Sequence, residues 1–233
     1  MTDIKLSKRM NAIVDMVDEE TVADIGCDHA FVSIALVQRD IASHVVAMDV
    51  RSGPVKIAIA NVHEHKMDSC IDVRISDGFE SLGEHEAECA IIAGMGGSLM
   101  VGILERGKAH LKNKISLVLQ PQSDIYLVRE YLHNVGYEIV RENMLVDEDK
   151  YYTIMRAVPA LATVSPYTKE ELEYGRILLA EKNPVLMEYL SYKYDKNEHI
   201  MMELKKKNTE KALDRINELI LEQQTIRSCL GQL

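Results

Sequence analysis

The chain of 233 residues lacks tryptophan, has only 5% aromatic residues, and carries four cysteines without a CxxC pair or metal-ligand spacing. This cysteine pattern argues against a disulfide framework and indicates a reducing compartment, and we expect no bound metal. No run approaches the 18 apolar residues of a membrane span, so we expect no membrane partner. The opening residues MTDIKLSKRM contain no apolar stretch like that of an export signal, and we expect a cytoplasmic protein.

An excess of basic residues is also missing, because 37 Asp and Glu outnumber 27 Lys and Arg and give a net charge of −10. The acidity belongs to residues 1–160, with 25 acidic against 16 basic side chains, whereas residues 161–233 hold 12 against 11. Local patches rather than totals govern attraction to phosphates. The run Lys205, Lys206 and Lys207 is therefore either a nucleic-acid contact or an ordinary solvated helix face.

Short apolar runs alternate with segments of helical periodicity up to about Val158, which predicts an α/β fold with a parallel sheet. Hydrophobic residues make up 47% of the chain, enough for a large core. The first five predicted strands are Thr21–Ile25, His44–Met48, Asp72–Ile75, Cys89–Ala93 and Ser116–Leu119. A helix over Tyr126–His133 follows, and then a hairpin of two strands, Tyr137–Leu145 and Tyr151–Val158. The sheet is therefore expected to have seven strands, one of them antiparallel.

A proline-bearing linker separates this first domain, residues 1–160, from a polar and helical second domain, residues 161–233. Thr168 with Glu171 resembles a capping box that opens a helix to about Lys182, and Asn183-Pro184 starts the next helix. An apolar 3-4-3 spacing then predicts a helical hairpin with coiled-coil-like packing. Its expected seam residues are Leu213, Ile216, Ile220 and Gln223.

The segment Ala23–Ala30 joins the end of the first strand directly to a helix, the place where α/β domains hold nucleotide-like cofactors. Asp24 and Gly26 fit that place, since glycine allows a ligand to approach the backbone closely. A dinucleotide fingerprint would continue with small residues, but Asp28 and His29 stand there. A carboxylate would repel a pyrophosphate, whereas it tolerates the cationic sulfonium of S-adenosylmethionine. The segment therefore predicts a methyltransferase.

Two further acids follow the next two strands. Asp49, with Val50 after it, lies 23 residues beyond Gly26 and is placed to accept hydrogen bonds from ribose hydroxyls. Asp77, followed by Gly78, could accept from an adenine amino group, although Asp-Gly is also a common turn. NAD and S-adenosylmethionine share that ribose, so these acids do not distinguish the two cofactors.

Glycines and carboxamides follow the fourth and fifth strands. Three glycines in four positions predict that backbone groups line a pocket for a flat ring, and the segment consists of Ala93, Gly94, Met95, Gly96 and Gly97. After the fifth strand, Gln120, Pro121 and Gln122 place amide groups at the same carboxyl edge of the sheet. Carboxamides can read the edge of a base, while a polar turn fixed by the proline is the alternative.

These segments in this order resemble the bacterial tRNA (adenine-N1)-methyltransferase family that modifies adenine 22 in the D-arm. The resemblance spans nearly the whole chain. The matching stretches are LSKR at 6–9, ADIGCDHAF at 23–31, SDGFE at 76–80, IAGMGG at 92–97, LQPQ at 119–122 and DKYYTIMRA at 149–157. It implies a Rossmann-like fold, S-adenosyl-L-methionine as cofactor and tRNA as partner.

The resemblance also implies roles for single residues. It places Asp28, with Arg9 and His29 nearby, at the catalytic side, and Tyr152 on a strand that faces the site. Asp28 is the candidate that stabilises charge on the base or accepts its N6 proton. Arg9, Gln120–Gln122 and the three lysines at 205–207 are the expected tRNA contacts. We expect a monomer or a weak homodimer.

Three alternatives stay open from the sequence. An NAD-dependent oxidoreductase could use the same fold, although the chain has no GxGxxG motif. A non-catalytic RNA-binding adaptor would share the fold, but it would not need acids at all three cofactor positions. A methyltransferase acting on another RNA or on a small molecule would have the same cofactor site.

Overall fold

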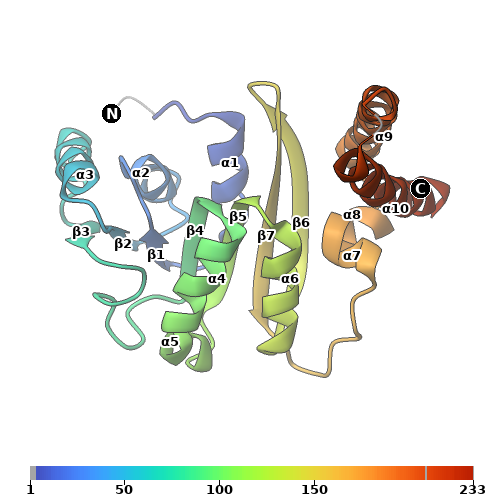
Figure 1. Ribbon diagram of the computed structural model, residues 1–233. Coiled ribbons are helices and arrows are strands. Elements are labelled where there is room, and N and C mark those ends of the chain that lie inside the picture. Colours follow the sequence, from blue (N-terminus) through green and yellow to red (C-terminus); the bar gives the residue numbers. More distant parts are fainter. Residues whose placement is uncertain (1–3, 208, 233) are drawn as a thin grey trace. The chain divides into compact units, whose positions relative to one another are not determined.

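The computed structural model describes residues 4–207 and 209–232, and its chain forms two compact units (Figure 1). The first unit is Met1–Pro166 and the second is Tyr167–Leu233. The boundary expected between residues 160 and 161 therefore falls in the irregular segment that ends the first unit.

The first unit is built on a seven-stranded sheet with the order β3-β2-β1-β4-β5-β7-β6. Strands β1 to β5 pair in parallel, and β7 is antiparallel to both of its neighbours, which confirms the expected single reversal. The strands are β1 (Thr21–Ile25), β2 (His44–Asp49), β3 (Ile71–Ile75), β4 (Cys89–Gly96), β5 (Ser116–Ser123), β6 (Tyr137–Asp147) and β7 (Lys150–Pro159).

Strands β4 and β5 run further than the apolar pattern predicts, and this shapes the carboxyl edge of the sheet. The pattern stops at Ala93 and Leu119, where the apolar side chains end. The two strands nevertheless stay paired beyond these residues, with register shifts on either side of Met95. The glycine segment of β4 is thus a bulged continuation of a strand rather than a free loop.

Six helices of the described residues belong to the first unit. They are α1 (Lys8–Val14), α2 (Phe31–Gln38), α3 (Ser52–Glu64), α4 (Gly97–Arg106), α5 (Lys108–Lys112) and α6 (Ile125–Asn134). Helix α2 packs against both α1 and α3, and α4 and α6 pack together in front of the sheet in Figure 1. The sequence pattern did not predict α1, which begins where Ser7 Oγ accepts a hydrogen bond from Met10 N at 3.3 Å.

Helix α1 is fixed to the β6–β7 hairpin within its first turn and again just after its last residue. At its start the Arg9 backbone N–H donates to Asp147 Oδ2 at 3.0 Å. After its end, Arg156 of β7 donates to the Met16 carbonyl at 3.0 Å and pairs with Glu19. These contacts hold the N-terminal segment against strands that lie far away in sequence.

The second unit contains α7 (Lys169–Tyr174), α8 (Arg176–Ala180), α9 (Pro184–Lys205) and α10 (Glu210–Gln232). The capping box of Thr168 and Glu171 is present as expected, and Asn183 caps α9 with Pro184 in its first turn. The prediction of one continuous helix to about Lys182 was wrong. Gly175 adopts a φ of +95°, and this divides the segment into α7 and α8.

The expected seam of α10 was partly wrong. Ile216 and Gln223 are buried, but Leu213 and Ile220 are 56% and 42% exposed. Ala212 and Leu219 are buried in their place. The buried residues of α10 therefore follow a 4-3-4 spacing that starts at Ala212, one residue before the expected Leu213. Counting apolar residues alone favoured the larger Leu213 over Ala212, although the small side chain is the one that lies inside the unit.

Candidate functional site

A cavity of about 490 Å³ lies at the carboxyl ends of β1, β2 and β4, where chain reversals in a parallel sheet leave backbone groups free. Its volume is in the range of small-molecule sites. The lining residues are Arg9, Met10, Ile13, Asp24, Gly26, Cys27, Asp28, Val32, Asp49, Arg51, Ile91, Ala93, Gly94, Met95 and Gln122. Nine of these were candidates from the sequence: Arg9, Asp24, Gly26, Asp28, Asp49, Ala93, Gly94, Met95 and Gln122.

Six lining residues were not candidates. Met10, Ile13, Val32 and Ile91 form an apolar part of the wall, and the last three belong to or pack against the hydrophobic core. Burial also raises the pKa of the Cys27 thiol, so this side chain is a neutral part of the wall. Arg51 is the one further charged residue. Its position two residues after Asp49 is a local signal that could have pointed to it.

Asp24 is a buried acid without a basic partner. It is 5% exposed, and its Oδ2 accepts a hydrogen bond from Ser33 Oγ at 2.6 Å. Burial is the main reason that its pKa rises to about 6, and the nearby Asp49 adds to the effect. Within residues 4–207 and 209–232 we find no Lys, Arg or His paired with it. A cationic ligand would relieve this uncompensated carboxylate.

Gly26 lets the chain turn at the end of β1 while staying close to β4. Its φ is +78°, and a Cβ at this position would lie 2.2 Å from Met95 Cε. Its N–H and that of Cys27 both donate to the Met48 carbonyl, at 2.7 and 2.9 Å. Any other residue here would have to displace the Met95 side chain and adopt an unfavourable backbone conformation.

The loop after Gly26 holds Asp28 at the cavity in a left-handed conformation. Asp28 and Ala30 have φ of +51° and +59°, values that few non-glycine residues adopt. The loop is held from α3, since Asn61 Nδ2 donates to the His29 carbonyl at 2.9 Å. His29 itself is not among the lining residues, and its Nε2 lies 3.9 Å from Asp28 Oδ1.

Arg51 joins two of the three acids at the cavity. Its backbone N–H donates to Asp49 Oδ1 at 2.9 Å, and its guanidinium lies 3.4 Å from the same oxygen and 3.9 Å from Asp28 Oδ1. Asp49 is 4% exposed, whereas the side chains of Asp28 and Arg51 are 63% and 68% exposed. The buried acid is therefore already oriented, and the outer pair can rearrange around a ligand.

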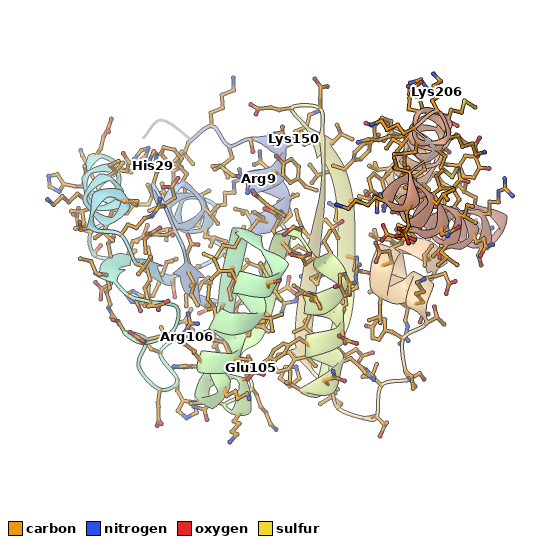
Figure 2. The ribbon with its side chains drawn as sticks, in the orientation of Figure 1. Arg9, His29, Glu105, Arg106, Lys150 and Lys206 are labelled. Atoms are coloured by element: carbon orange, nitrogen blue, oxygen red, sulfur yellow. The ribbon has the colours of Figure 1, made fainter. Side chains whose placement is uncertain are left out.

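Arg9 reaches the cavity from α1, beside the hairpin end that carries Lys150 (Figure 2). Its Nη1 donates to Gln120 Oε1 at 2.9 Å, and its guanidinium lies 5.5 Å from the centre of the Tyr152 ring. The Arg9 backbone N–H, with Ser7, also holds the pKa of Asp147 below its usual range. The structure thus brings Arg9 and Tyr152 together. Arg9 is one of the lining residues of the cavity, and Tyr152 is not.

The remaining candidates of the first unit are not among the lining residues of the cavity. Asp77 accepts a hydrogen bond at 2.9 Å from Arg106, which lies at the end of α4 (Figure 2). Gly97 has a packing reason, because a Cβ there would lie 2.4 Å from the Asp124 carbonyl oxygen. The others outside the lining are Val50, Gly78, Gly96, Gln120 and Pro121.

The lysine run lies in the second unit, at the end of α9 and just after it. Lys205, Lys206 and Lys207 are all exposed, and Lys206 Nζ lies 2.5 Å from Glu203 Oε1. Lys193, earlier on α9, instead pairs with Glu222 at 2.7 Å and is only 20% exposed. The lysine run is thus exposed to solvent, with Lys206 in a surface ion pair, whereas Lys193 stabilises the unit.

Two kinds of feature are not found in the part of the chain that the structure describes. No group of three or more His, Cys, Asp or Glu side chains there could hold a metal ion. No helix of that part combines the length and apolar character that a membrane crossing requires.

A family model described as tRNA (adenine(22)-N(1))-methyltransferase matches residues 22–225 of this chain. The protein of that name from Bacillus subtilis (strain 168) is 37% identical to it over 158 residues. The aligned region covers 67% of this chain and 66% of the B. subtilis protein. The chain thus aligns with just under two thirds of that relative.

Two solved structures are similar over almost the full length. The crystal structure of the B. subtilis m1A22 tRNA methyltransferase TrmK is 29% identical, with a TM-score of 0.86, and the match covers 97% of this chain and 99% of that chain. The Streptococcus pneumoniae protein Sp1610, in complex with S-adenosyl-L-methionine, is 28% identical, with a TM-score of 0.86 and coverage of 97% and 100%.

Proposed function

The chain belongs to the tRNA (adenine(22)-N(1))-methyltransferase family, and we infer that it transfers a methyl group from S-adenosyl-L-methionine to N1 of adenine 22 in tRNA. The observation that carries this inference is the cavity at the carboxyl edge of the sheet, with the uncompensated carboxylate of Asp24 inside it. An NAD-dependent oxidoreductase is not supported, because the carboxylate of Asp28 lines the cavity and would repel a pyrophosphate.

The residues at the cavity fit S-adenosyl-L-methionine. The buried carboxylates of Asp24 and Asp49 suit a ligand that carries positive charge and ribose hydroxyls. Gly94, with a φ of +77°, leaves open space next to the backbone, because a Cβ there would have no atom nearer than 3.8 Å. When bound, the cofactor supplies a methyl group on a sulfonium, which is open to attack by a nucleophile.

The chain's own residues align the base and manage its charge. The lone pair of adenine N1 forms the new bond to the methyl carbon as the bond from that carbon to sulfur breaks, and the ring gains positive charge. We assign Asp28 to stabilise this charge or to accept a proton from N6. Arg9 and Tyr152, held together beside the cavity, position the base, and alignment supplies most of the acceleration.

Cofactor affinity should depend on pH through Asp24. The pKa of about 6 belongs to the protein without ligand, and a cationic ligand favours the ionised carboxylate. Below about pH 6 the Asp24 carboxyl is mostly protonated, and the cofactor can bind only after this proton is released. We expect the Kd for S-adenosyl-L-methionine to be nearly constant around pH 7 and to rise towards roughly tenfold per pH unit below 6. Calorimetric titrations from pH 5 to 7 measure this, and Asp24→Asn is the control that should lose the dependence.

We propose that the second unit holds tRNA by its backbone through Lys205–Lys207. Replacing all three by alanine should weaken tRNA binding severalfold and reduce its salt dependence by roughly one power of salt concentration for each phosphate that is no longer neutralised. The matched control removes three exposed lysines before β5, with Lys108, Lys112 and Lys114 all changed to alanine. Equal tRNA affinities of the two triple variants in filter-binding assays would refute the proposed contact.

The decisive experiment incubates the protein with unmodified tRNA and methyl-labelled cofactor and maps the labelled nucleoside. We expect 1-methyladenosine at position 22, and label at another position or in no RNA would contradict the proposed reaction. A tRNA with adenine 22 replaced by guanine is the substrate control. We further propose a monomer or weak homodimer working in the cytoplasm, for which sedimentation at micromolar concentration and cell fractionation are the tests.

A further inference from the structure

The bulge in β4 leaves the Gly94 N–H without a ladder partner on the backbone of β5. Ala93 pairs with Gln120 and Met95 pairs with Pro121, so Gly94 is the extra residue between two ladder positions. Its φ of +77° turns the chain at the cavity wall. At this bulge the Gly94 N–H bonds to a side chain instead of to a backbone carbonyl of the ladder.

Gln120 supplies the acceptor for this N–H. Its side chain is fully buried, and its Oε1 accepts from the Gly94 N–H at 3.2 Å. The other end of the same carboxamide is fixed as well, because Nε2 donates to the Pro121 carbonyl at 3.1 Å. The amide therefore has one orientation, with its oxygen towards β4.

The oxygen that accepts from Gly94 also accepts from Arg9. Arg9 Nη1 lies 2.9 Å from Gln120 Oε1, while the guanidinium keeps further N–H donors and lines the cavity. We propose that Gln120 is a positioning residue for methyl transfer, in that its fixed carboxamide oxygen sets the place of the Arg9 guanidinium. This inference rests on the proposed function, since Arg9 is assigned there to the base.

This role differs from the base contact that the sequence suggested for Gln120. A carboxamide with both ends engaged and no exposed surface has nothing to offer the edge of a purine. Of the two partners of its oxygen, Gly94 belongs to the β4 bulge and Arg9 brings a charged side chain to the cavity, so the effect on turnover passes through Arg9. The loss should consequently appear in turnover and leave cofactor affinity nearly unchanged.

Two substitutions separate the acceptor oxygen from the bulk of the side chain. Gln120→Met keeps an unbranched chain of similar length but has no comparable acceptor. Gln120→Glu keeps the acceptor for Arg9 and exchanges the N–H that donates to the Pro121 carbonyl for an oxygen. A misplaced guanidinium should lower kcat roughly 10- to 100-fold in Gln120→Met, with the Kd for S-adenosyl-L-methionine changed less than threefold. Gln120→Glu should recover kcat to within about fivefold of the wild type.

A double-mutant cycle with Arg9→Met tests the path of the effect. If Gln120 acts through Arg9, adding Gln120→Met to Arg9→Met should lower kcat no further than twofold. The control is Ser116→Ala, which removes another buried hydrogen bond of β5, at 2.7 Å to Glu19, from the opposite end of the strand. The factors by which Ser116→Ala and Arg9→Met lower kcat should simply multiply in the double variant, as for two independent sites.

The outcomes distinguish this inference from the proposed function. A wild-type protein that forms no 1-methyladenosine would defeat both. An active wild type with independent, multiplying losses in Gln120→Met and Arg9→Met would overturn the positioning role alone. The same holds if Gln120→Glu, folded by circular dichroism and binding cofactor normally, is as slow as Gln120→Met.

Discussion

Replacing Asp28 by asparagine is expected to lower the rate of methyl transfer by roughly 10²- to 10⁴-fold, the usual contribution of a charged or proton-accepting group at the reacting atom. The carboxylate is lost, whereas the shape of the side chain is kept. Asparagine also tolerates the left-handed conformation of Asp28, with its φ of +51°, better than alanine does. The change therefore tests the charge and not the loop.

Single-turnover kinetics with saturating tRNA and cofactor measure this effect. Asp40→Asn is the matched control, because Asp40 has a φ of +54°, is exposed and does not line the cavity. The control should be as active as the wild type, and Asp28→Asn should still bind S-adenosyl-L-methionine within a fewfold of the wild-type Kd. Turnover of Asp28→Asn within threefold of the wild type would remove Asp28 from the mechanism.

The second large effect is expected for Asp24→Asn, which should raise the stability of the protein and lower its affinity for the cofactor. Asp24→Asn should make the ligand-free protein more stable at neutral pH and at the same time weaken cofactor binding by roughly 10- to 100-fold, a loss typical of an ionic contact. The physical reason is that Asp24 is ionised, buried and unpaired by any described base above pH 6. The Asp24 carboxylate thus increases the affinity for the ligand and lowers the stability of the ligand-free protein.

The sign follows from the direction of the pKa shift. The carboxyl pKa rises from 3.8 to about 6 on folding, so its contribution to stability is present below 3.8 and is lost as pH rises through 6. A shift of this size corresponds to about 3 kcal/mol at most. Asp24→Asn should recover part of it at pH 7.5, and each kcal/mol raises the melting temperature by roughly 2–4 °C.

Thermal unfolding without ligand at pH 7.5 and at pH 4 tests the stability half of this prediction. The variant should melt several degrees above the wild type at pH 7.5, and the difference should shrink at pH 4, where both side chains are largely neutral. Ser33→Ala removes the hydroxyl that donates to Asp24 and should lower the melting temperature instead. An Asp24→Asn protein less stable than the wild type at pH 7.5 would show that Asp24 is compensated within the protein.

Much of the fold could be predicted from the order of apolar runs. All seven strands form within a few residues of their expected positions, because each buried parallel strand is a short apolar run that needs no information about its neighbours. The seam of α10 shows the limit of this approach. Leu213 and Ala212 are adjacent, and only packing within the second unit decides which of them is buried.

The candidate site divides in the same way. Asp24, Gly26 and Asp49 were found because strand ends carry their signal locally, as an acid or a glycine at a fixed distance from an apolar run. Gln120 looked like a ligand contact for the same reason. Its burial beneath Arg9 and Gly94 depends on a bulge in another strand, 26 residues away in sequence.

By itself the sequence determined the α/β plan, the edge of the sheet where the site lies, the acids that suit a cationic cofactor and the family. These features follow from short-range periodicity and from residue types at strand ends. The tertiary structure alone decided that Arg9 lines the cavity, that Arg51 joins Asp28 to Asp49 and that the buried Gln120 oxygen accepts from Arg9 and Gly94. Each of these depends on side chains from separate elements meeting in space, and such meetings are fixed by register, bulges and packing, which leave no local trace in the chain.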